Sequence, residues 1–532
     1  MSSQVPGTTR RDLLRLSTVG LTGAALGALT TGCSKPLDKG ADVSGHSSST
    51  GTAMPQTPLH YRTLTDVAAR IASGDLDSLQ VTRDMLARLE ALEPRLHTYI
   101  TVTGDRALER AAAADVRRDA GEQLGPLHGV PIAVKDLCLT RGVATTAGHS
   151  FRKQGPSDYN ATVVVRLEAA GGILLGKLAT TEGAMVGYHR DFAVPRNPWG
   201  DGDRWPGVSS GGSGASTAAG LCFASLGTDT GGSIRYPSGA NGLVGIKPTW
   251  GRVSRNGVLD LAPTLDHVGP MTRSVRDAAR VLGVIAGRDE LDPTSLPDPV
   301  DGYENGLQRG IDGVRIGWDE SLASEGTAPY VASAVSEAVS RLNALGAEIV
   351  EVRVPRLEPD EGDAWTTLAS VEAAAVHEDT FPARAAEYGV YFREFLTGGA
   401  AVSGVEYAKA VFARRRAIGR MRPLFDHIDL LACPTLATEA FRYDPDDAYG
   451  GFDSATGRIA GVPVEFFGSC GPFITVWDYN GYPTLSQPCG MSPDGLPLSL
   501  QLVGPPLTEA LLCRVGHAYE QATEWHLKHP EL

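Results

Sequence analysis

Two short apolar runs bounded by glycine constrain the fold more than any other feature of the chain. Residues 130–134 read Val-Pro-Ile-Ala-Val and residues 173–175 read Ile-Leu-Leu, without a polar position in either run. A strand without polar alternation is buried on both faces, so covering layers must lie on both sides of a sheet. Residues 221–226 and 349–354 predict further strands.

Helical periodicity surrounds these runs. Apolar residues recur at helical spacing, and helices are predicted over residues 65–74, 78–92, 107–120, 162–170, 275–286 and 331–345. Helices combined with buried strands indicate an α/β or α+β architecture around a large sheet. Residues 355–470 are the least patterned part, and they predict long surface loops or a substrate-facing lid.

Charge and cysteine content exclude several classes of protein. The chain has 62 acidic against 48 basic residues, a formal net charge of -14, and no run rich in Lys or Arg. This distribution argues against a nucleic-acid partner. Seven cysteines in 532 residues, without CxxC or CxxH spacing, exclude a disulfide-built scaffold and a structural zinc site.

The N-terminus has the features of an export signal. Arg10 and Arg11 precede a mildly apolar stretch, which predicts a twin-arginine (Tat) signal over residues 1–33. The alternative is a disordered basic start. Residues 29–33 resemble a lipoprotein cleavage box, in which case Cys33 carries a lipid that is the only membrane contact. The protein is then exported, either extracellular or anchored to the membrane as a lipoprotein.

A low-complexity segment follows the signal. Residues 34–58 consist largely of Ser, Gly, Thr, Pro and Asp, so they cannot bury enough surface to fold and form a flexible linker. The folded domain is predicted over residues 59–526.

Lys135 ends the apolar run at residues 130–134. A lysine there is either a surface residue that reaches water along its stem or a buried functional amine, and the position alone favours the surface residue. Burial would lower its pKa and leave a neutral amine able to act as a base.

Two glycine- and serine-rich segments lie in the middle of the chain. Residues 206–215 run into an Ala-rich helical stretch at 215–220, where backbone N–H groups favour negative charge. Residues 226–235 follow a strand-like run and place two glycines before Ser233. Such glycines let consecutive N–H groups converge on one oxygen, forming an oxyanion hole. A flexible loop and a plain strand–turn–helix joint are the respective alternatives.

A serine nucleophile needs a base, and His267 is the best placed of the twelve histidines, although it could equally be a loop residue. Residues 207–211 satisfy the G-x-S-x-G pattern of α/β-hydrolases. That motif requires a buried strand immediately before it, and residues 197–206, rich in Pro, Gly and Asp, cannot form one.

Together, Lys135, Ser209 and Ser233 resemble the Ser–cisSer–Lys triad of the amidase signature family. Ser209 and Ser233 are 24 residues apart, as in that family's motif, and the lysine lies upstream as expected. The resemblance covers nearly the whole folded part and passes through residues 64–115, 181–185, 197–199, 245–249, 480–483 and 497–501. It implies a single large α/β domain with a mixed, twisted central β-sheet covered by helices.

The resemblance also implies a mechanism. Ser233 would attack an amide carbonyl, Ser209 would relay its proton to neutral Lys135, and the peptide bond entering Ser209 would be cis. The oxyanion would be held by the backbone N–H groups of Thr230, Gly231, Gly232 and Ser233. No metal or organic cofactor is needed.

Other residues have supporting roles in this picture. Ser210 is expected to hydrogen-bond within the network of active-site residues. Asp229 and Arg235 flank the turn that carries Ser233, here called the nucleophile turn, and are expected to be scaffold. Val208 stands where the family usually has glycine, a departure that bears on the shape of the pocket and not on the triad.

The resemblance implies that the substrate is a small-molecule or peptide amide. Met185 and Tyr188 lie where the family places wall residues near the acyl site, and Trp477 and Tyr479 could add an aromatic wall. These residues favour aryl or peptidic amides over acetamide-sized ones.

Several other functions stay open at this point. The same triad could transfer the acyl group to an amine and act as an amide synthase, or the site could be dead in a binding protein. An α/β-hydrolase-type esterase is a further alternative. The N-terminal helices and C-terminal segments also resemble the A-subunit of the tRNA-dependent amidotransferase, a role that the Tat signal and the acidic chain argue against. The sequence leaves the oligomeric state open.

Overall fold

The computed structural model describes residues 57–300 and 302–532. The export signal at 1–33, Cys33 and nearly all of the linker at 34–58 therefore lie outside the described residues. The described part begins with a 3-10 helix at Leu59–Tyr61. None of its helices combines the length and the apolar character needed to cross a membrane.

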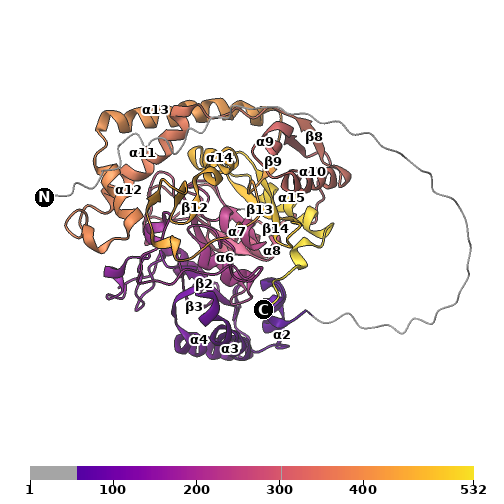
Figure 1. Cartoon of the computed structure of the whole chain (residues 1–532). Helices are drawn as coiled ribbons and strands as arrows, with labels where there is room; N and C mark the ends of the chain where they lie inside the picture. Colours follow the sequence, from indigo (N-terminus) through magenta and orange to yellow (C-terminus); the bar gives the residue numbers. More distant parts are fainter. Residues whose placement is uncertain (1–56, 301) are drawn as a thin grey trace, which may run out of the picture.

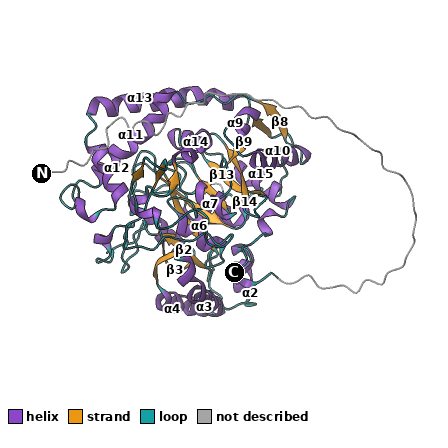
Figure 2. Ribbon diagram, viewed as in Figure 1, coloured by secondary structure: helices purple, strands orange, loops and turns teal. Residues whose placement is uncertain are grey.

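One sheet of 11 strands runs through the middle of the molecule, with helices packed around it (Figure 2). Its strands, in spatial order, are β1 (Tyr99–Val102), β3 (Ile173–Leu178), β2 (Pro131–Lys135), β4 (Ala224–Asp229), β6 (His267–Thr272), β5 (Val244–Lys247), β13 (Thr484–Met491), β14 (Pro497–Val503), β9 (Leu430–Pro434), β7 (Arg315–Trp318) and β8 (Glu348–Glu351). Parallel pairs lie toward the two edges, in β3–β2–β4 and β9–β7–β8, while the centre is antiparallel. The mixed central sheet is confirmed.

The strands predicted from apolar runs are present. Every residue of β2, β3 and β4 is buried, as their lack of polar alternation requires. The run at 349–354 contributes β8, which lies at the edge of the sheet and is half exposed.

Helices cover both faces of the sheet (Figure 1). Their bounds are α2 (Leu64–Ser73), α3 (Ser78–Leu96), α4 (Gly104–Asp119), α5 (Thr162–Ala169), α6 (Gly211–Ala218), α7 (Arg235–Asn241), α8 (Val275–Ile285), α9 (Glu320–Ser324), α10 (Pro329–Ala344), α11 (Pro359–Val376), α12 (Val390–Ala400), α13 (Gly404–Met421), α14 (Val464–Tyr479) and α15 (Glu509–Gln521). The six predicted helices are confirmed with small shifts at their ends. The helix expected at 215–220 instead begins at Gly211, inside the Gly/Ser cluster.

The prediction of long loops over 355–470 is wrong. This segment forms α11, α12 and α13, strand β9, and a small sheet of β10 (Phe452–Asp453), β11 (Arg458–Ile459) and β12 (Val462–Pro463). The buried faces of α11 and α13 are made largely of alanine, including Ala364, Ala369 and Ala373 on α11 and Ala410, Ala413 and Ala417 on α13. Alanine gives little hydrophobic contrast along a sequence, so the helical period was hidden although the helices pack closely.

A buried carboxylate fixes the first long helix to the core. Asp277 of α8 accepts the backbone N–H groups of Leu64 and Thr65 at 2.9 Å each, so it satisfies two donors at the start of α2. The C-terminal segment also returns to this region, where His529 stacks on Tyr61 with ring centroids 4.1 Å apart.

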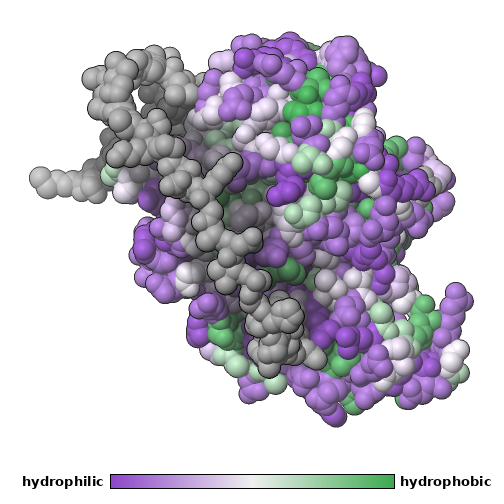
Figure 3. Space-filling view, turned by 90° about the vertical axis from the view of Figure 1, so that its right-hand side faces the viewer, coloured by the Kyte–Doolittle hydropathy of each residue, from purple (hydrophilic) through white to green (hydrophobic). Residues whose placement is uncertain are grey.

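The face shown in Figure 3 is mainly hydrophilic, with smaller apolar areas among the polar side chains.

Candidate active site

Lys135 lies at the carboxyl end of β2 and is fully buried. Its Nζ lies 2.7 Å from Ser209 Oγ and 2.8 Å from Thr228 Oγ1. The expectation of a surface lysine is wrong, because the whole side chain is inaccessible to solvent and its amine lies between the hydroxyls of Ser209 and Thr228, which are also buried. Thr228, one residue before the end of β4, was not singled out from the sequence.

The environment of Lys135 favours the neutral amine. Burial lowers the pKa of Lys135 to about 7, and the more distant carboxylates of Asp229 and Asp266 only partly oppose the shift. Its two hydrogen-bond partners are hydroxyl groups, which carry no charge. At neutral pH the amine can therefore accept a proton.

Ser209 lies in the loop that leads into α6. The peptide bond between Val208 and Ser209 is cis, as the family resemblance implied. Ser210 connects this loop to β4: its Oγ donates to the carbonyl of Thr228 and accepts the backbone N–H of Thr228, both at 3.3 Å. No strand immediately precedes Ser209 in the described structure, so the α/β-hydrolase arrangement is absent here.

Ser233 lies in the turn between β4 and α7 and borders a cavity. Both glycines before it are required by close contacts. A Cβ on Gly231 would lie 2.6 Å from the indole of Trp365, and one on Gly232, where φ is +115°, would lie 2.4 Å from the ring of Tyr236. The Ser233 hydroxyl makes no hydrogen bond with any residue that the structure describes.

The carboxylate of Asp229 holds this turn in place through hydrogen bonds to its backbone. Its carboxylate accepts the N–H of Gly232 at 2.6 Å and that of Ile234 at 3.0 Å. The structure differs here from the expected oxyanion hole, because the N–H of Gly232 already donates to Asp229. The N–H groups of Gly231 and Ser233 make no hydrogen bond within the described residues.

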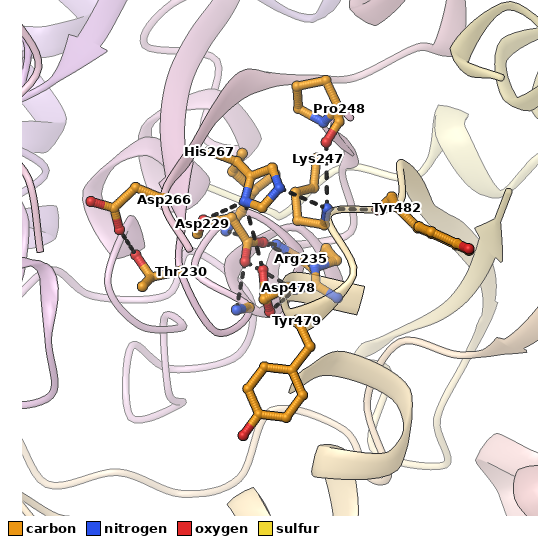
Figure 4. A network of polar contacts seen from close by, with 12 residues as sticks. Asp229, Thr230, Arg235, Lys247, Pro248, Asp266, His267, Asp478, Tyr479 and Tyr482 are labelled. Atoms are coloured by element: carbon orange, nitrogen blue, oxygen red, sulfur yellow. Dashed lines mark hydrogen bonds and ion pairs between the residues drawn. The ribbon is translucent and has the colours of Figure 1, made fainter. Parts of the chain in front are cut away.

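Arg235 balances the buried charge of Asp229 (Figure 4). Its guanidinium contacts Asp229 at 2.9 Å and Asp478 of α14 at 2.6 Å, and all three side chains are fully buried. Burial alone would raise the pKa of Asp229, but the adjacent Arg235 outweighs it and holds the pKa well below its usual range. Asp229, Arg235 and Asp478 thus form one buried charge network next to the turn.

His267 belongs to the same buried network and not to the cavity. Its Nδ1 lies 3.2 Å from the carbonyl of Asp229 and its Nε2 lies 3.3 Å from Nζ of Lys247. Burial holds its pKa well below the usual range, so the ring is neutral. Lys247 was missed as a network residue, although it ends the buried strand β5 as Lys135 ends β2.

A cavity of about 400 Å³ opens beside Ser233. Met185 and Val208 line it, whereas Tyr188 is buried elsewhere and does not reach it. Trp477 and Tyr479 are also buried away from the cavity. The aromatic wall comes from Tyr236, Trp365, Tyr391, Phe395 and Phe467.

Charge is scarce in the cavity. Among the described residues that line it, Arg356 and Glu358 are the charged ones. The described part of the chain also holds no group of three or more His, Cys, Asp or Glu side chains placed to bind a metal ion. The site therefore combines a buried amine of lowered pKa, hydroxyl groups and backbone N–H groups that have no partner among the described residues with a largely apolar cavity wall.

Comparisons with known proteins identify the family of the chain. Residues 80–513 match the model of the family described as Amidase. The protein named AmiD of Mycobacterium tuberculosis is 41% identical over 469 residues, which cover 88% of this chain and 95% of that protein. The A-subunit of the glutamyl-tRNA(Gln) amidotransferase of Chloroflexus aurantiacus is 39% identical over 500 residues, covering 90% and 99%.

Solved structures give the same result. The peptide amidase of Stenotrophomonas maltophilia superposes with a TM-score of 0.75 and 31% sequence identity, covering 89% of this chain and 99% of that one. The fold, the family match over most of the chain and these likenesses lead to one conclusion: the chain belongs to the amidase signature family and is an amide hydrolase.

Proposed function

We propose that the protein hydrolyses amides through an acyl-enzyme formed on Ser233. The observation that carries this proposal is the buried amine of Lys135, with a pKa of about 7, 2.7 Å from the hydroxyl of Ser209. A neutral amine has a lone pair, so it can take the Ser209 proton while Ser209 takes the proton of Ser233. The Ser233 hydroxyl must turn toward Ser209 when substrate binds.

The bond changes balance over two steps. Ser233 Oγ attacks the amide carbon, and the proton now on Lys135 returns through Ser209 to the leaving amine as the C–N bond breaks. Water then attacks the acyl ester and gives one proton to the same relay. The relay returns this proton to Ser233 Oγ as the ester C–O bond breaks, which releases the carboxylic acid and restores the Ser233 hydroxyl. The oxyanion of each tetrahedral intermediate is held by N–H groups of the turn, among which those of Gly231 and Ser233 make no hydrogen bond in the described part of the chain.

A fluorophosphonate probe tests the nucleophile. We expect the probe to modify Ser233 in the purified protein lacking residues 1–33, because this hydroxyl borders the cavity and, in the proposed mechanism, Lys135 activates it through Ser209. Peptide mass spectrometry would locate the label, and Ser233→Ala should abolish it. Labelling at Ser209 in place of Ser233 would contradict the proposal.

The pKa of Lys135 predicts the pH profile. Because only the neutral amine accepts a proton, kcat/KM should rise about tenfold per unit of pH below about 7 and level off above it. Lys135→Arg, which cannot lose its charge, should reduce kcat/KM by about 10³-fold at pH 6 to 9.

Other buried groups provide the control for this profile. Burial also raises the pKa of Glu182 and of Asp266 to about 7. Glu182→Gln and Asp266→Asn should therefore keep the inflection near pH 7 if Lys135 causes it. Loss of the inflection in either variant would assign it to that carboxyl instead.

The cavity favours amides with a bulky, uncharged acyl group. Its walls are apolar and aromatic, and one of the structural relatives is a peptide amidase. Burying one large apolar side chain contributes about 1.5–3 kcal/mol, or about 10- to 100-fold in kcat/KM. A C-terminal peptide amide ending in Phe or Leu should outcompete acetamide by that factor in a mixed-substrate assay. Faster turnover of acetamide would exclude this substrate class.

We also propose that residues 1–33 direct export and that residues 59–526 form the exported domain, on the basis of Arg10 and Arg11 and the composition of the linker. Replacing both arginines with lysine should retain the protein inside the cell, as fractionation would show. Cys33→Ser should permit export but move the protein from the membrane to the soluble fraction. Export of the double-lysine variant at the normal level would refute the twin-arginine signal.

A further inference from the structure

We infer that Trp365 is a positioning residue that holds the backbone N–H of Gly231 toward the reacting carbonyl oxygen. The inference rests on the proposed function of Ser233. Trp365 lies on α11, 135 positions from Thr230 in sequence. The sequence motif around Ser233 therefore gives no indication of it.

The key contact is a hydrogen bond from the indole to the turn. Trp365 Nε1–H donates to the carbonyl oxygen of Thr230 at 3.0 Å. In a trans peptide the C=O of one residue and the N–H of the next point in opposite directions within one plane. Fixing the carbonyl of Thr230 therefore also fixes the direction of the Gly231 N–H, which has no hydrogen-bond partner among the described residues.

The next peptide plane is held from another side. The N–H of Gly232 donates to Asp229 Oδ1 at 2.6 Å, so the peptide between Gly231 and Gly232 is also fixed. Asp229 and Trp365 thus hold two consecutive peptide planes. Gly231 lies between them and packs directly against the indole, since an added Cβ would lie 2.6 Å from Trp365 Cζ2.

The helix that carries Trp365 is firmly anchored. One turn earlier, the carbonyl of Glu361 accepts the hydroxyl of Tyr479 at 2.5 Å, and its fully buried carboxylate forms an ion pair with Arg420 of α13. Glu358 and Glu361 also form a capping box at the start of α11. Because this helix is held in place, its indole can restrain the peptide between Thr230 and Gly231, where glycine allows a wide range of backbone angles.

Trp365 also forms part of the cavity wall, so it connects substrate binding to the turn. A bulky acyl group in the cavity would press against the indole and oppose its movement away from Thr230. This arrangement predicts that bulky acyl groups gain in kcat and not only in affinity, since they stabilise an interaction made in the transition state.

The test replaces Trp365 with phenylalanine, which keeps an aromatic wall and removes the N–H donor. Losing an oxyanion donor outright costs about 10²–10³-fold in kcat. Losing only its orientation should cost about 10-fold in kcat on a peptide amide, with KM changed less than about threefold. Affinity for a peptidyl trifluoromethyl ketone, which forms an oxyanion on Ser233, should fall by a similar factor, while affinity for the product acid stays the same.

Phe395→Leu is the matched control, because Phe395 lines the same cavity from α12 and makes no hydrogen bond to the turn. It should raise KM and leave the ratio of ketone to product affinity unchanged. Thermal unfolding should show both variants folded.

The outcomes are distinct. Wild-type kcat and ketone affinity in Trp365→Phe, or a change confined to KM as in Phe395→Leu, would overturn this inference and leave the proposed function standing. A wild-type enzyme that neither hydrolyses amides nor accepts the fluorophosphonate on Ser233 would overturn both.

Discussion

The buried carboxylate of Asp229 is the interaction on which the geometry of the active site depends. It ends β4, accepts two backbone N–H groups of the nucleophile turn, and pairs with Arg235 at the start of the next helix. A charge buried this deeply is tolerated only when it is paired and hydrogen-bonded. Arg235 supplies that pairing and also reaches Asp478 of α14, so the turn, the sheet and a distant helix share one charge network.

Two buried lysines on neighbouring strands show how the groups in contact with an amine determine what the amine can do. Lys177 of β3 lies 2.9 Å from the carboxylate of Asp136 and forms a buried ion pair. Among the residues that the structure describes, Lys135 of β2 has only the hydroxyls of Ser209 and Thr228 within hydrogen-bond distance. Without a carboxylate in contact, burial dominates and lowers its pKa to about 7. The same residue type is therefore structural on one strand and available as a base on the next.

Much of the architecture could be predicted because it depends on local pattern. Uninterrupted apolar runs identified β2 and β3, and regular apolar spacing identified helices such as α8. Predictions failed where packing depends on distant segments. The alanine-rich α11 and α13 bury each other, and Tyr188, Trp477 and Tyr479 point into the core instead of the cavity. Trp365 had no local signal, because its partner Thr230 is far away in the chain.

The sequence by itself determined the buried strands, the glycines of the nucleophile turn and the spacing of Lys135, Ser209 and Ser233, since these are properties of short segments. Only the tertiary structure decided which of these groups are in contact and in what state of charge. Complete burial lowers the pKa of Lys135 to about 7, and the carboxylate of Asp229 accepts the N–H of Gly232. The burial of Lys135 depends on segments distant in sequence. Asp229 and Gly232 are close in sequence, but the buried carboxylate stays charged because Arg235 pairs with it and also reaches Asp478 of α14, which is far away in the chain.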